Sequence, residues 1–296
     1  MKRRNFLQLS TIAGIGLSLP MSGILNACSK DPEHSLEFKN LITGLLKEWC
    51  DGMLKVQINN PSNLEEHGAL GCPSCAHIHG RCMDAVYPFL YMADISGDKK
   101  YIEGAKLVML WAENNVSQEN GAWTVVRNPK SWKGITIFGA IALAEALHYH
   151  GHVLDAKTKE AWTKRLERAG QYVYDTFTID FTNINYPGTA VYGLNLIGNV
   201  SERADFKAKS KKLASEVKVY FTKNEGLLFG ECKKSSSKLS EKGLHGVDLG
   251  YNVEETLNSL VMYALKEKDE ELLQILTKSL NSHLEFMLPD GAWDNS

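Results

Sequence analysis

Four apolar segments recur along the chain at nearly regular intervals, and each is followed by an amphipathic segment. The apolar segments begin near residues 80, 134, 187 and 249, which gives intervals of 54, 53 and 62 residues. A helix that is apolar on all sides must be covered by protein, whereas an amphipathic helix leaves one face in water. Repeats of this length indicate stacked helical hairpins, and their spacing is well above the ~34 residues of tetratricopeptide repeats.

One pair of segments shows the pattern clearly. Residues 135–149, ITIFGAIALAEALHY, contain Glu145 as their one acidic residue. Residues 155–177 place Trp162, Leu166 and Val173 on one stripe and charged residues elsewhere, so we expect their outer side to face water. The same pairing is predicted for 80–95 with 98–115, for 186–197 with 203–221, and for 249–265 with 269–288.

Alternating buried and half-buried helices predict an all-α protein, an (α/α) toroid with an inner ring of apolar helices and an outer ring of amphipathic ones. A superhelical solenoid of helix pairs is the alternative. The connecting segments repeat as well: NGAWTVV at 120, NEGLLFG at 224 and DGAWDNS at 290 each follow an amphipathic helix. Asn120-Gly121 and Asp290-Gly291 are turn dipeptides, and we expect the residues after them to be briefly extended.

The N-terminus has the pattern of an export signal. Basic residues 2–4 precede an uncharged run from 9 to 27 that is rich in Gly, Ser and Leu. The stretch RRNFL at 3–7 resembles the twin-arginine export motif, and LNAC at 25–28 resembles a lipobox in which Cys28 is lipidated. An uncleaved N-terminal anchor helix is the alternative. We therefore predict an exported protein, lipid-anchored through Cys28 in the periplasm or at the outer membrane.

The predicted organisation is a signal peptide at 1–27, a tether at 28–34 and a toroidal domain at 35–296. Removal of the signal leaves 30 basic residues against 35 acidic ones, a net charge of −5. This balance gives no reason to expect nucleic-acid binding.

A toroid brings the starts of its inner helices together at one mouth, so residues near those starts are the candidate site. Polar and aromatic side chains gather there: His77, His79, Arg81 and Asp84; Trp123, Arg127, Trp132 and Lys133; Asn183, Asn185 and Tyr186; His245, Asp248, Tyr251, Asn252, Glu254 and Glu255; Trp293 and Asp294. Positions 248, 251, 252 and 255 have the i, i+3, i+4, i+7 spacing of one helix face.

These residue types are the ones that a carbohydrate site uses. Aromatic faces stack on the C–H faces of sugar rings, and Asn, Asp, Arg and His form hydrogen bonds to hydroxyl and carboxylate groups. Arg81, Arg127 and Lys133 suit an anionic sugar such as a uronic acid, and only the arginines can pair with it in bidentate fashion. Each residue also has a structural alternative, because Asp at a helix start is a good cap and Trp after a turn is often core.

The stretches HGRCMDAVYPFLYMA, NINYPGTAVYGL, VDLGYNVEETL and EFMLPDGAWDNS resemble exported bacterial lipoproteins with an (α/α) toroid, allied to heparinase-like polysaccharide lyases and toroidal glucuronidases. The resemblance covers most of residues 40–296. It implies a carbohydrate-active enzyme for uronate-containing polysaccharides or oligosaccharides. Such relatives continue past DGAWDNS, so the resemblance implies a chain truncated at its C-terminus. A small complete helical protein is the alternative.

Two enzymatic mechanisms compete for this site. In β-elimination, Asn, His or Arg neutralises the uronate carboxylate, a Tyr or His removes the C5 proton, and a Tyr protonates the leaving oxygen. The candidates are Tyr186, Tyr251, His245, Asn183, Asn252 and Arg81. In hydrolysis, two carboxylates flank the glycosidic bond, and the candidates are Asp248, Glu254, Glu255, Asp84 and Asp294. The abundance of Tyr, Asn and His favours the lyase. A non-catalytic, lipid-anchored glycan-binding protein is a third possibility, which needs the aromatic residues but not His245.

Residues 71–82, GCPSCAHIHGRC, hold three cysteines and two histidines just before the first inner helix. Their position favours contacts of the histidines with sugar, and we expect no cofactor. Two alternatives remain: a zinc site with Cys72, Cys75, His77 and Cys82 as ligands, because C-x-x-C is a zinc-binding spacing, and a Cys72–Cys75 disulfide formed after export.

Overall fold

The computed structural model describes residues 32–72, 74, 77–229, 246–247, 249–292 and 294. Its α-helices are α3 (Pro32–Val56), α4 (Val86–Ser96), α5 (Lys99–Asn115), α6 (Thr136–His150), α7 (Ala156–Thr176), α8 (Asn185–Val200), α9 (Ala204–Val217), α10 (Leu249–Tyr251), α11 (Leu257–Glu267) and α12 (Glu270–Leu284). Short 3₁₀ turns lie at Gly80–Ala85, Gly151–Val153 and Lys218–Tyr220. A π-helical turn, Asn252–Thr256, joins α10 to α11.

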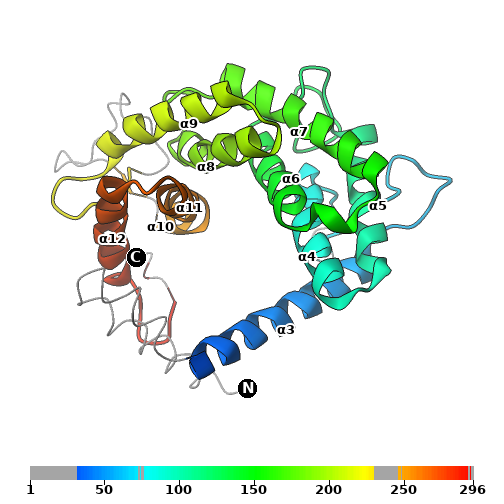
Figure 1. Cartoon of the computed structure of the whole chain (residues 1–296), viewed down its shortest axis with the longest axis horizontal. Helices are drawn as coiled ribbons and strands as arrows, with labels where there is room; N and C mark the ends of the chain where they lie inside the picture. The colour runs from blue at the N-terminus through cyan, green and yellow to red at the C-terminus, as the bar shows by residue number, and fades with distance from the viewer. Residues whose placement is uncertain are drawn as a thin grey trace.

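The helices form two concentric layers. Figure 1 shows α4, α6, α8 and α11 on the inner side of a curved arrangement, with α5, α7, α9 and α12 on the outer side. Consecutive inner helices contact each other, and each packs on the outer helix that follows it. Inner segments begin at Gly80, Thr136, Asn185 and Leu249, close to the predicted starts. The predicted (α/α) toroid is confirmed, because the described helices curve through most of a ring (Figure 1).

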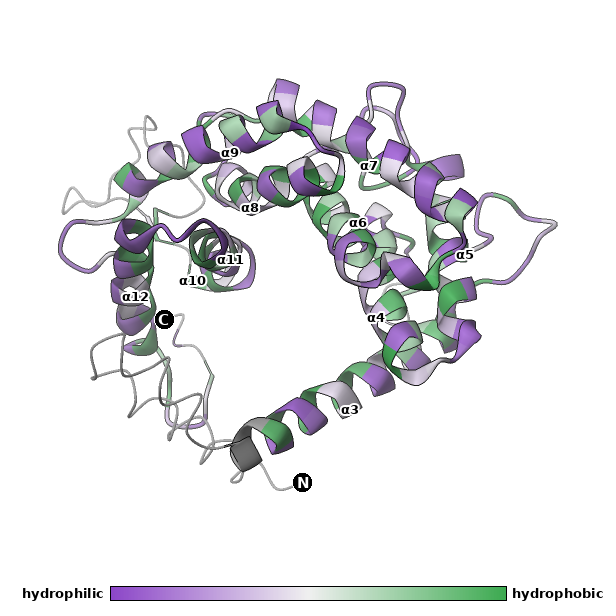
Figure 2. Cartoon of the chain, viewed as in Figure 1, coloured by the Kyte–Doolittle hydropathy of each residue, from purple (hydrophilic) through white to green (hydrophobic). Residues whose placement is uncertain are grey.

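Hydropathy explains which helix takes which layer. Figure 2 shows hydrophilic residues concentrated on the outer helices and pale to hydrophobic residues on α6. In α7, Trp162, Leu166 and Val173 are buried as predicted, while Lys164 and Arg168 are exposed. The hydrophobic core therefore lies between the two layers, where the apolar stripes of the outer helices cover the inner ring.

Aspartates mark where outer helices begin. The side chains of Asp98, Asp155 and Asp269 accept hydrogen bonds from the backbone N–H groups of Lys100, Thr158 and Leu272 at 3.0, 2.8 and 3.0 Å. Each bond satisfies a donor that the first helical turn leaves unpaired. These caps lie at the end of the ring opposite to the inner-helix starts, since each follows the C-terminus of an inner helix.

The turns after the outer helices share one design. Single antiparallel bridges pair Gln57 with Leu70, Ser117 with Trp123, and Phe221 with Leu228. After α12, the Leu288 N–H donates to the Ala292 carbonyl at 2.7 Å. The brief extension predicted after Asn120-Gly121 is confirmed by the bridge at Trp123. The turn at 57–70 adds a member that the sequence pattern did not reveal.

These turns pack against the next outer helix along the chain. Gly121 has φ +90°, and a Cβ atom built on it would lie 2.1 Å from the Arg168 carbonyl oxygen of α7. Gly68 and Gly226 also have positive φ; a Cβ atom on Gly68 would lie 2.1 Å from the Leu107 carbonyl oxygen of α5, and one on Gly226 would lie 3.2 Å from the Lys278 side chain of α12. Side chains of those helices donate to turn carbonyls: Trp111 to Glu65, Arg165 to Gly121, Lys278 to Lys223, and Ser282 to Glu225. The turns thus couple neighbouring hairpins.

No helix in the described ranges is both long and apolar enough to cross a membrane. The predicted signal peptide and the lipidation site Cys28 lie outside the described residues.

Candidate active site

The starts of the inner helices converge on one cluster of side chains. Arg81 comes from the 3₁₀ turn before α4, Phe138 from the first turn of α6, Tyr186 from the start of α8, and Glu255 from the π-helical turn before α11. Contacts of Arg81 with Glu255 and Phe138, and of Tyr186 with Phe138, join residues from different repeats. The expectation that a toroid gathers these segments at one mouth is met by this arrangement.

Arg81 lies at the centre of the cluster. Its Nε atom is 2.8 Å from Asp84 Oδ2, its NH1 atom is 3.7 Å from Glu255 Oε1, and its guanidinium lies 4.4 Å from the centre of the Phe138 ring. Burial opposes the charge of Arg81, but Asp84, Glu255 and the more distant Glu254 outweigh it, so its pKa is raised. The side chain remains 45% exposed, so the guanidinium is held in place and still accessible.

Glu255 is the buried partner of Arg81. It is 8% exposed, and its Oε2 atom accepts a hydrogen bond from Asn185 Nδ2 at 2.9 Å. The Thr189 hydroxyl donates to the backbone carbonyl of Glu255 at 3.3 Å. Asn185 and Thr189 belong to α8, so the π-helical turn is fastened to the neighbouring inner helix. π turns often occur at functional sites because they redirect side chains within a helix.

Asp84 shares Arg81 with Glu255. Burial raises the pKa of the Asp84 carboxyl to about 6, and the nearby Arg81 guanidinium opposes part of that rise. Its second oxygen, Oδ1, is buried and has no hydrogen-bond partner among the described residues. Asp84 therefore positions Arg81 from a largely desolvated location.

An aromatic platform lies beside Arg81. Trp132 is 43% exposed and stacks on Phe181 with ring centres 5.7 Å apart, and Phe181 stacks on Phe177 at 4.1 Å. The Trp132 Nε1–H group donates to the Tyr186 hydroxyl oxygen at 2.8 Å. The Tyr186 ring in turn lies 5.8 Å from that of Phe138. Trp132 is thus connected to Arg81 through Tyr186 and Phe138. An exposed indole face and a guanidinium in one site suit an anionic sugar.

The described residues of the helix face predicted at 248–255 do not all share one environment. Tyr251 is 45% exposed, whereas Asn252 is 1% exposed and Glu255 is 8% exposed. The π-helical turn changes the angular spacing, which is why the α-helical prediction fails. Asn252 donates to the backbone carbonyl of Leu228 at 3.0 Å. The prediction that Asn252 is catalytic is therefore corrected, because it anchors the 221–229 turn from inside the protein.

Trp123 was also expected at the mouth, and this prediction is wrong. Its side chain is 0% exposed. The Arg165 guanidinium lies 3.7 Å from the centre of its ring, and its Nε1–H group donates to Glu113 at 3.2 Å. Trp123 is enclosed between the layers, so it cannot stack on a sugar.

Other predicted residues lie near the surface. His77 and His79 are exposed, with ring centres 6.4 Å apart, and Lys133 and Asn183 are half-buried. Arg127 forms an ion pair with Glu65 at 2.7 Å, and Asp294 is exposed, with its N–H donating to the Phe286 carbonyl at 2.7 Å. His245, Asp248 and Trp293 lie outside the described residues.

The Cys/His stretch shows no metal-binding geometry in its described part. Cys72, His77 and Cys82 are described and Cys75 is not, and no group of three or more His, Cys, Asp or Glu side chains that could hold a metal occurs among the described residues. Burial raises the pKa of the Cys82 thiol to about 12, so Cys82 is a neutral group packed against the core. The Cys72–Cys75 disulfide stays a prediction.

Two site residues were missed by sequence reasoning. Phe138 lies under the Arg81 guanidinium, and Phe181 forms the lower layer of the aromatic platform. Phe181 precedes an inner-helix start, as the other candidates do, so its position was a usable signal. Phe138 lies within an apolar helix, where nothing distinguishes a site phenylalanine from a core one.

Comparison with known proteins identifies the family of this chain. Residues 46–296 match the family described as the ulvan lyase N-terminal domain. The chain is 79% identical over 296 residues to a broad-specificity ulvan lyase from Formosa agariphila, and it spans 46% of that protein's length.

Solved structures share the fold at low sequence identity. A sugar epimerase from a ruminal bacterium superposes with a TM-score of 0.62 at 11% identity, covering 85% of this chain and 74% of the epimerase. The cellobiose 2-epimerase of Bacillus thermoamylovorans gives a TM-score of 0.55 at 14% identity, covering 73% of this chain and 63% of that chain. The fold and the family match together show that this chain belongs to the ulvan lyase N-terminal domain family.

Proposed function

We propose that this chain belongs to a polysaccharide lyase that cleaves an acidic, uronate-containing polysaccharide of the ulvan type by β-elimination. The observation that carries the proposal is the 79% identity, along the whole of this chain, to a broad-specificity ulvan lyase. The chain spans about half of that relative's length. The geometry of the inner-helix site supports the same chemistry.

Arg81 is proposed to bind the carboxylate of the uronate. Its guanidinium is partly exposed and held by Asp84, Glu255 and Phe138. A guanidinium paired with the substrate carboxylate stabilises the negative charge that develops when the C5 proton leaves. Because three partners fix its orientation, little side-chain entropy is lost when the substrate binds.

Tyr186 is proposed to transfer a proton in the elimination. The C5 proton goes to a base, its electron pair forms the C4–C5 double bond, and the C4–O bond breaks as the leaving oxygen receives a proton. The hydrogen bond from Trp132 to the Tyr186 oxygen stabilises a phenolate, so Tyr186 can carry a proton in either direction. Two further candidates for this proton transfer are Tyr251 and His245. Tyr251 is exposed and lies four residues before Glu255 in the sequence.

Hydrolysis by paired carboxylates is less well supported. A hydrolase needs two carboxylates on opposite sides of the glycosidic bond. Asp84 and Glu255 instead lie on the same guanidinium, and Glu255 is buried beneath it. Their arrangement is that of groups which position Arg81.

Export through the twin-arginine route and lipidation at Cys28 are proposed from the sequence pattern at residues 3–7 and 25–28. Expression with a labelled fatty acid tests this. Label in the wild-type protein and none in Cys28→Ser supports the anchor, and label in both variants would contradict the assignment of Cys28.

The reaction is tested with ulvan as substrate, recording absorbance near ~232 nm together with reducing ends, because only elimination forms the unsaturated product. We expect both signals to rise. Reducing ends without absorbance would show hydrolysis and overturn the proposal. The assay uses a protein extended to the length of the curated relative and, in parallel, the present chain.

Tyr186→Phe separates the role of the hydroxyl from that of the ring. The variant keeps the ring contacts with Phe138 and Trp132, and we expect kcat to fall by about 10²- to 10⁴-fold, as for the loss of a general acid or base. Tyr174→Phe, on outer helix α7, is the matched control and should retain wild-type kcat. Equal rates for wild type and Tyr186→Phe would remove Tyr186 from the mechanism.

A further inference from the structure

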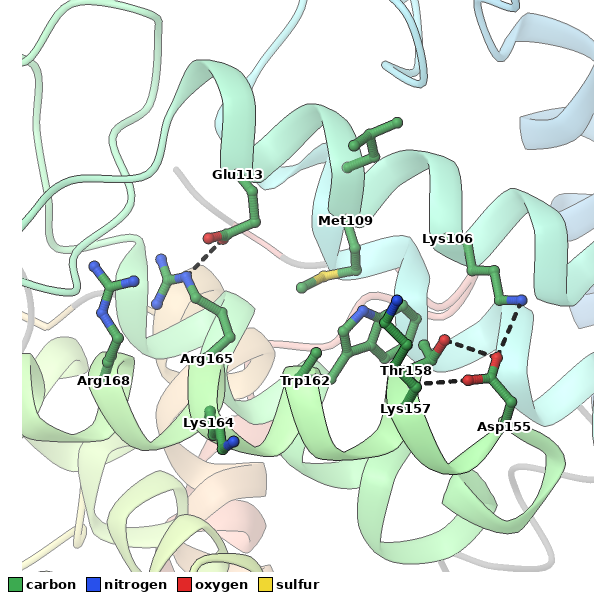
Figure 3. A pocket seen from close by; sticks show the side chains of 12 residues that line it. Lys106, Met109, Glu113, Asp155, Lys157, Thr158, Trp162, Lys164, Arg165 and Arg168 are labelled. Carbon is green, nitrogen blue, oxygen red and sulfur yellow. Dashed lines mark hydrogen bonds and ion pairs between the residues drawn. The ribbon is translucent and has the colours of Figure 1, made fainter.

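A second concavity lies on the outer surface, between the outer helices α5 and α7 (Figure 3). Its volume is about 670 Å³. None of the residues that line it belongs to the inner-helix site. We call it the α5–α7 groove, and its lining includes Lys106, Met109, Glu113, Trp162, Arg165 and Arg168.

The groove is basic although the chain as a whole is weakly acidic. Lys106, Lys157, Lys164, Arg165 and Arg168 line it together with two acidic residues, Glu113 and Asp155, whereas the net charge of the chain is −2. The acidic pair is already engaged: Glu113 accepts from Arg165 at 2.6 Å, and Asp155 lies 3.5 Å from Lys106. Within the described part of the chain, no carboxylate forms an ion pair with Lys157 or Arg168.

Three exposed cations of the groove form a row on one helix face. Lys157, Lys164 and Arg168 are all exposed on α7. Their spacing of seven and four residues places them on the same side of the helix. At 1.5 Å per residue, the row is about 16 Å long. A row of this kind fits a linear polymer with repeated negative charges better than a single small anion.

The floor of the groove is apolar and fixed. Met109, Ala161 and Trp162 line it. Arg165 is nine-tenths buried, and beyond Glu113 it donates to the Gly121 carbonyl at 2.9 Å and to the Ser117 hydroxyl at 3.1 Å, while it stacks on Trp123. Figure 3 shows Arg165 and Glu113 facing each other across the groove. The floor is therefore built into the fold. Of the three exposed α7 cations, Lys164 pairs with Glu160 at 2.6 Å, and Arg168 donates to the Gln118 and Glu119 carbonyls at 3.4 and 3.3 Å. Exposed contacts of this kind contribute little stability, so an anionic ligand can replace them.

We propose that the α5–α7 groove is an accessory site that binds the acidic polysaccharide chain away from the inner-helix site. The carboxylates or other anionic groups of the polymer pair with Lys157, Lys164 and Arg168, and the C–H faces of its sugars lie on the apolar floor. The nature of the polymer rests on the proposed function. Binding at this site keeps a long substrate on the enzyme between cleavages. The accessory site therefore affects the cleavage of polymers and not that of short fragments.

The test compares two triple variants of equal charge change. Lys157→Gln, Lys164→Gln and Arg168→Gln remove the groove cations, and Lys207→Gln, Lys211→Gln and Lys212→Gln remove three exposed cations from outer helix α9. Binding is measured by retardation in native gels that contain ulvan or a neutral glucan. We expect the groove variant to bind ulvan on the order of tenfold more weakly and the α9 variant to match wild type. Added salt should abolish the difference.

Several outcomes overturn the proposal. Unchanged binding by the groove variant, or an equal loss in both variants, would show that the groove is not a specific site. Competition by double-stranded DNA as effective as that by ulvan would show a general polyanion surface. If the triple variant unfolds, as judged by circular dichroism, Lys157→Gln alone repeats the comparison against Lys207→Gln.

Activity separates this proposal from the proposed function. The groove variant should show a higher KM on ulvan and an unchanged kcat/KM on its short oligosaccharides. Equal losses on both substrates would contradict an accessory role. Weaker binding by the groove variant in a protein that cleaves no polysaccharide would uphold the groove while rejecting the lyase.

Discussion

At the scale of single residues, the site is organised around the positive charge of Arg81, which is shared between two carboxylates. Arg81 is in contact with Asp84, Glu255 and the Phe138 ring, which come from three different inner segments. Removing a partner of a buried charge is costly because the remaining charge stays desolvated. The two carboxylates and the guanidinium are therefore coupled, and the state of Asp84 affects the position of Arg81.

Asp84 makes the stability of the protein depend on pH. Its folded pKa of about 6 lies above the ordinary value of 3.8, because burial disfavours the ionised form. The folded state thus binds this proton more tightly than the unfolded state does. The resulting contribution is fully present below about pH 4 and is lost as the pH rises through 6.

Urea unfolding at pH 4 and pH 7 measures this contribution. Between these pH values, we expect the unfolding free energy of the wild type to fall relative to that of Asp84→Asn by on the order of 1–3 kcal/mol. Asparagine does not ionise, so the variant lacks this component. The same pH dependence in both proteins would show that Asp84 is not desolvated.

At the scale of elements, the turns after the outer helices hold neighbouring hairpins together. The Gly121 turn receives hydrogen bonds from Arg165 of α7, and it places its backbone against the Arg168 carbonyl. A residue with a Cβ atom would be strained by this positive φ and by this close approach.

Gly121→Ala tests this coupling. We expect a loss of at least about 2 kcal/mol in the free energy of unfolding, since the φ of +90° is unfavourable and the new Cβ would meet backbone at 2.1 Å. Gly52→Ala is the matched control: it lies within α3, with nothing within 4 Å of the added Cβ, and should leave stability unchanged or raise it by up to about 1 kcal/mol. Denaturant unfolding followed by circular dichroism gives both values. Similar values for the two variants would contradict the close packing of this turn.

At the scale of the whole molecule, the chain is a row of hairpins bent into a ring. Consecutive inner helices contact each other, α4 with α6, α6 with α8 and α8 with α11, so stability is transmitted mainly between neighbours (Figure 1). Such arrangements approach the behaviour of repeat proteins, in which each unit has its own stability and an interface with the next.

Leu272→Ala in α12 tests whether the ring unfolds in parts. Leu272 is fully buried, and its truncation should cost about 2–5 kcal/mol. We expect native-state hydrogen exchange to accelerate in α11 and α12 and to change little in α4 and α6, because those helices lie several contacts away. An equal acceleration in all helices would show a single cooperative unit.

The sequence alone determined the number, order and layer of the hairpins. This information is local, because the pattern of apolar residues within one segment, such as 135–149, shows how much of that helix is covered by protein. The convergence of inner-helix starts also followed, since it is a geometric consequence of the layered ring. The sequence therefore predicts that Arg81, Trp132 and Tyr186 lie in one site.

Only the tertiary structure decided which residues at these starts face the solvent. Trp123 and Trp132 both lie in the segment between α5 and α6, yet Trp123 is enclosed by Arg165 and Trp132 is exposed on Phe181. Asn252 and Tyr251 are adjacent, yet the π-helical turn sends one into the protein and leaves the other exposed. The partners that settle these outcomes lie tens of residues away, in other hairpins, so no local pattern can report them.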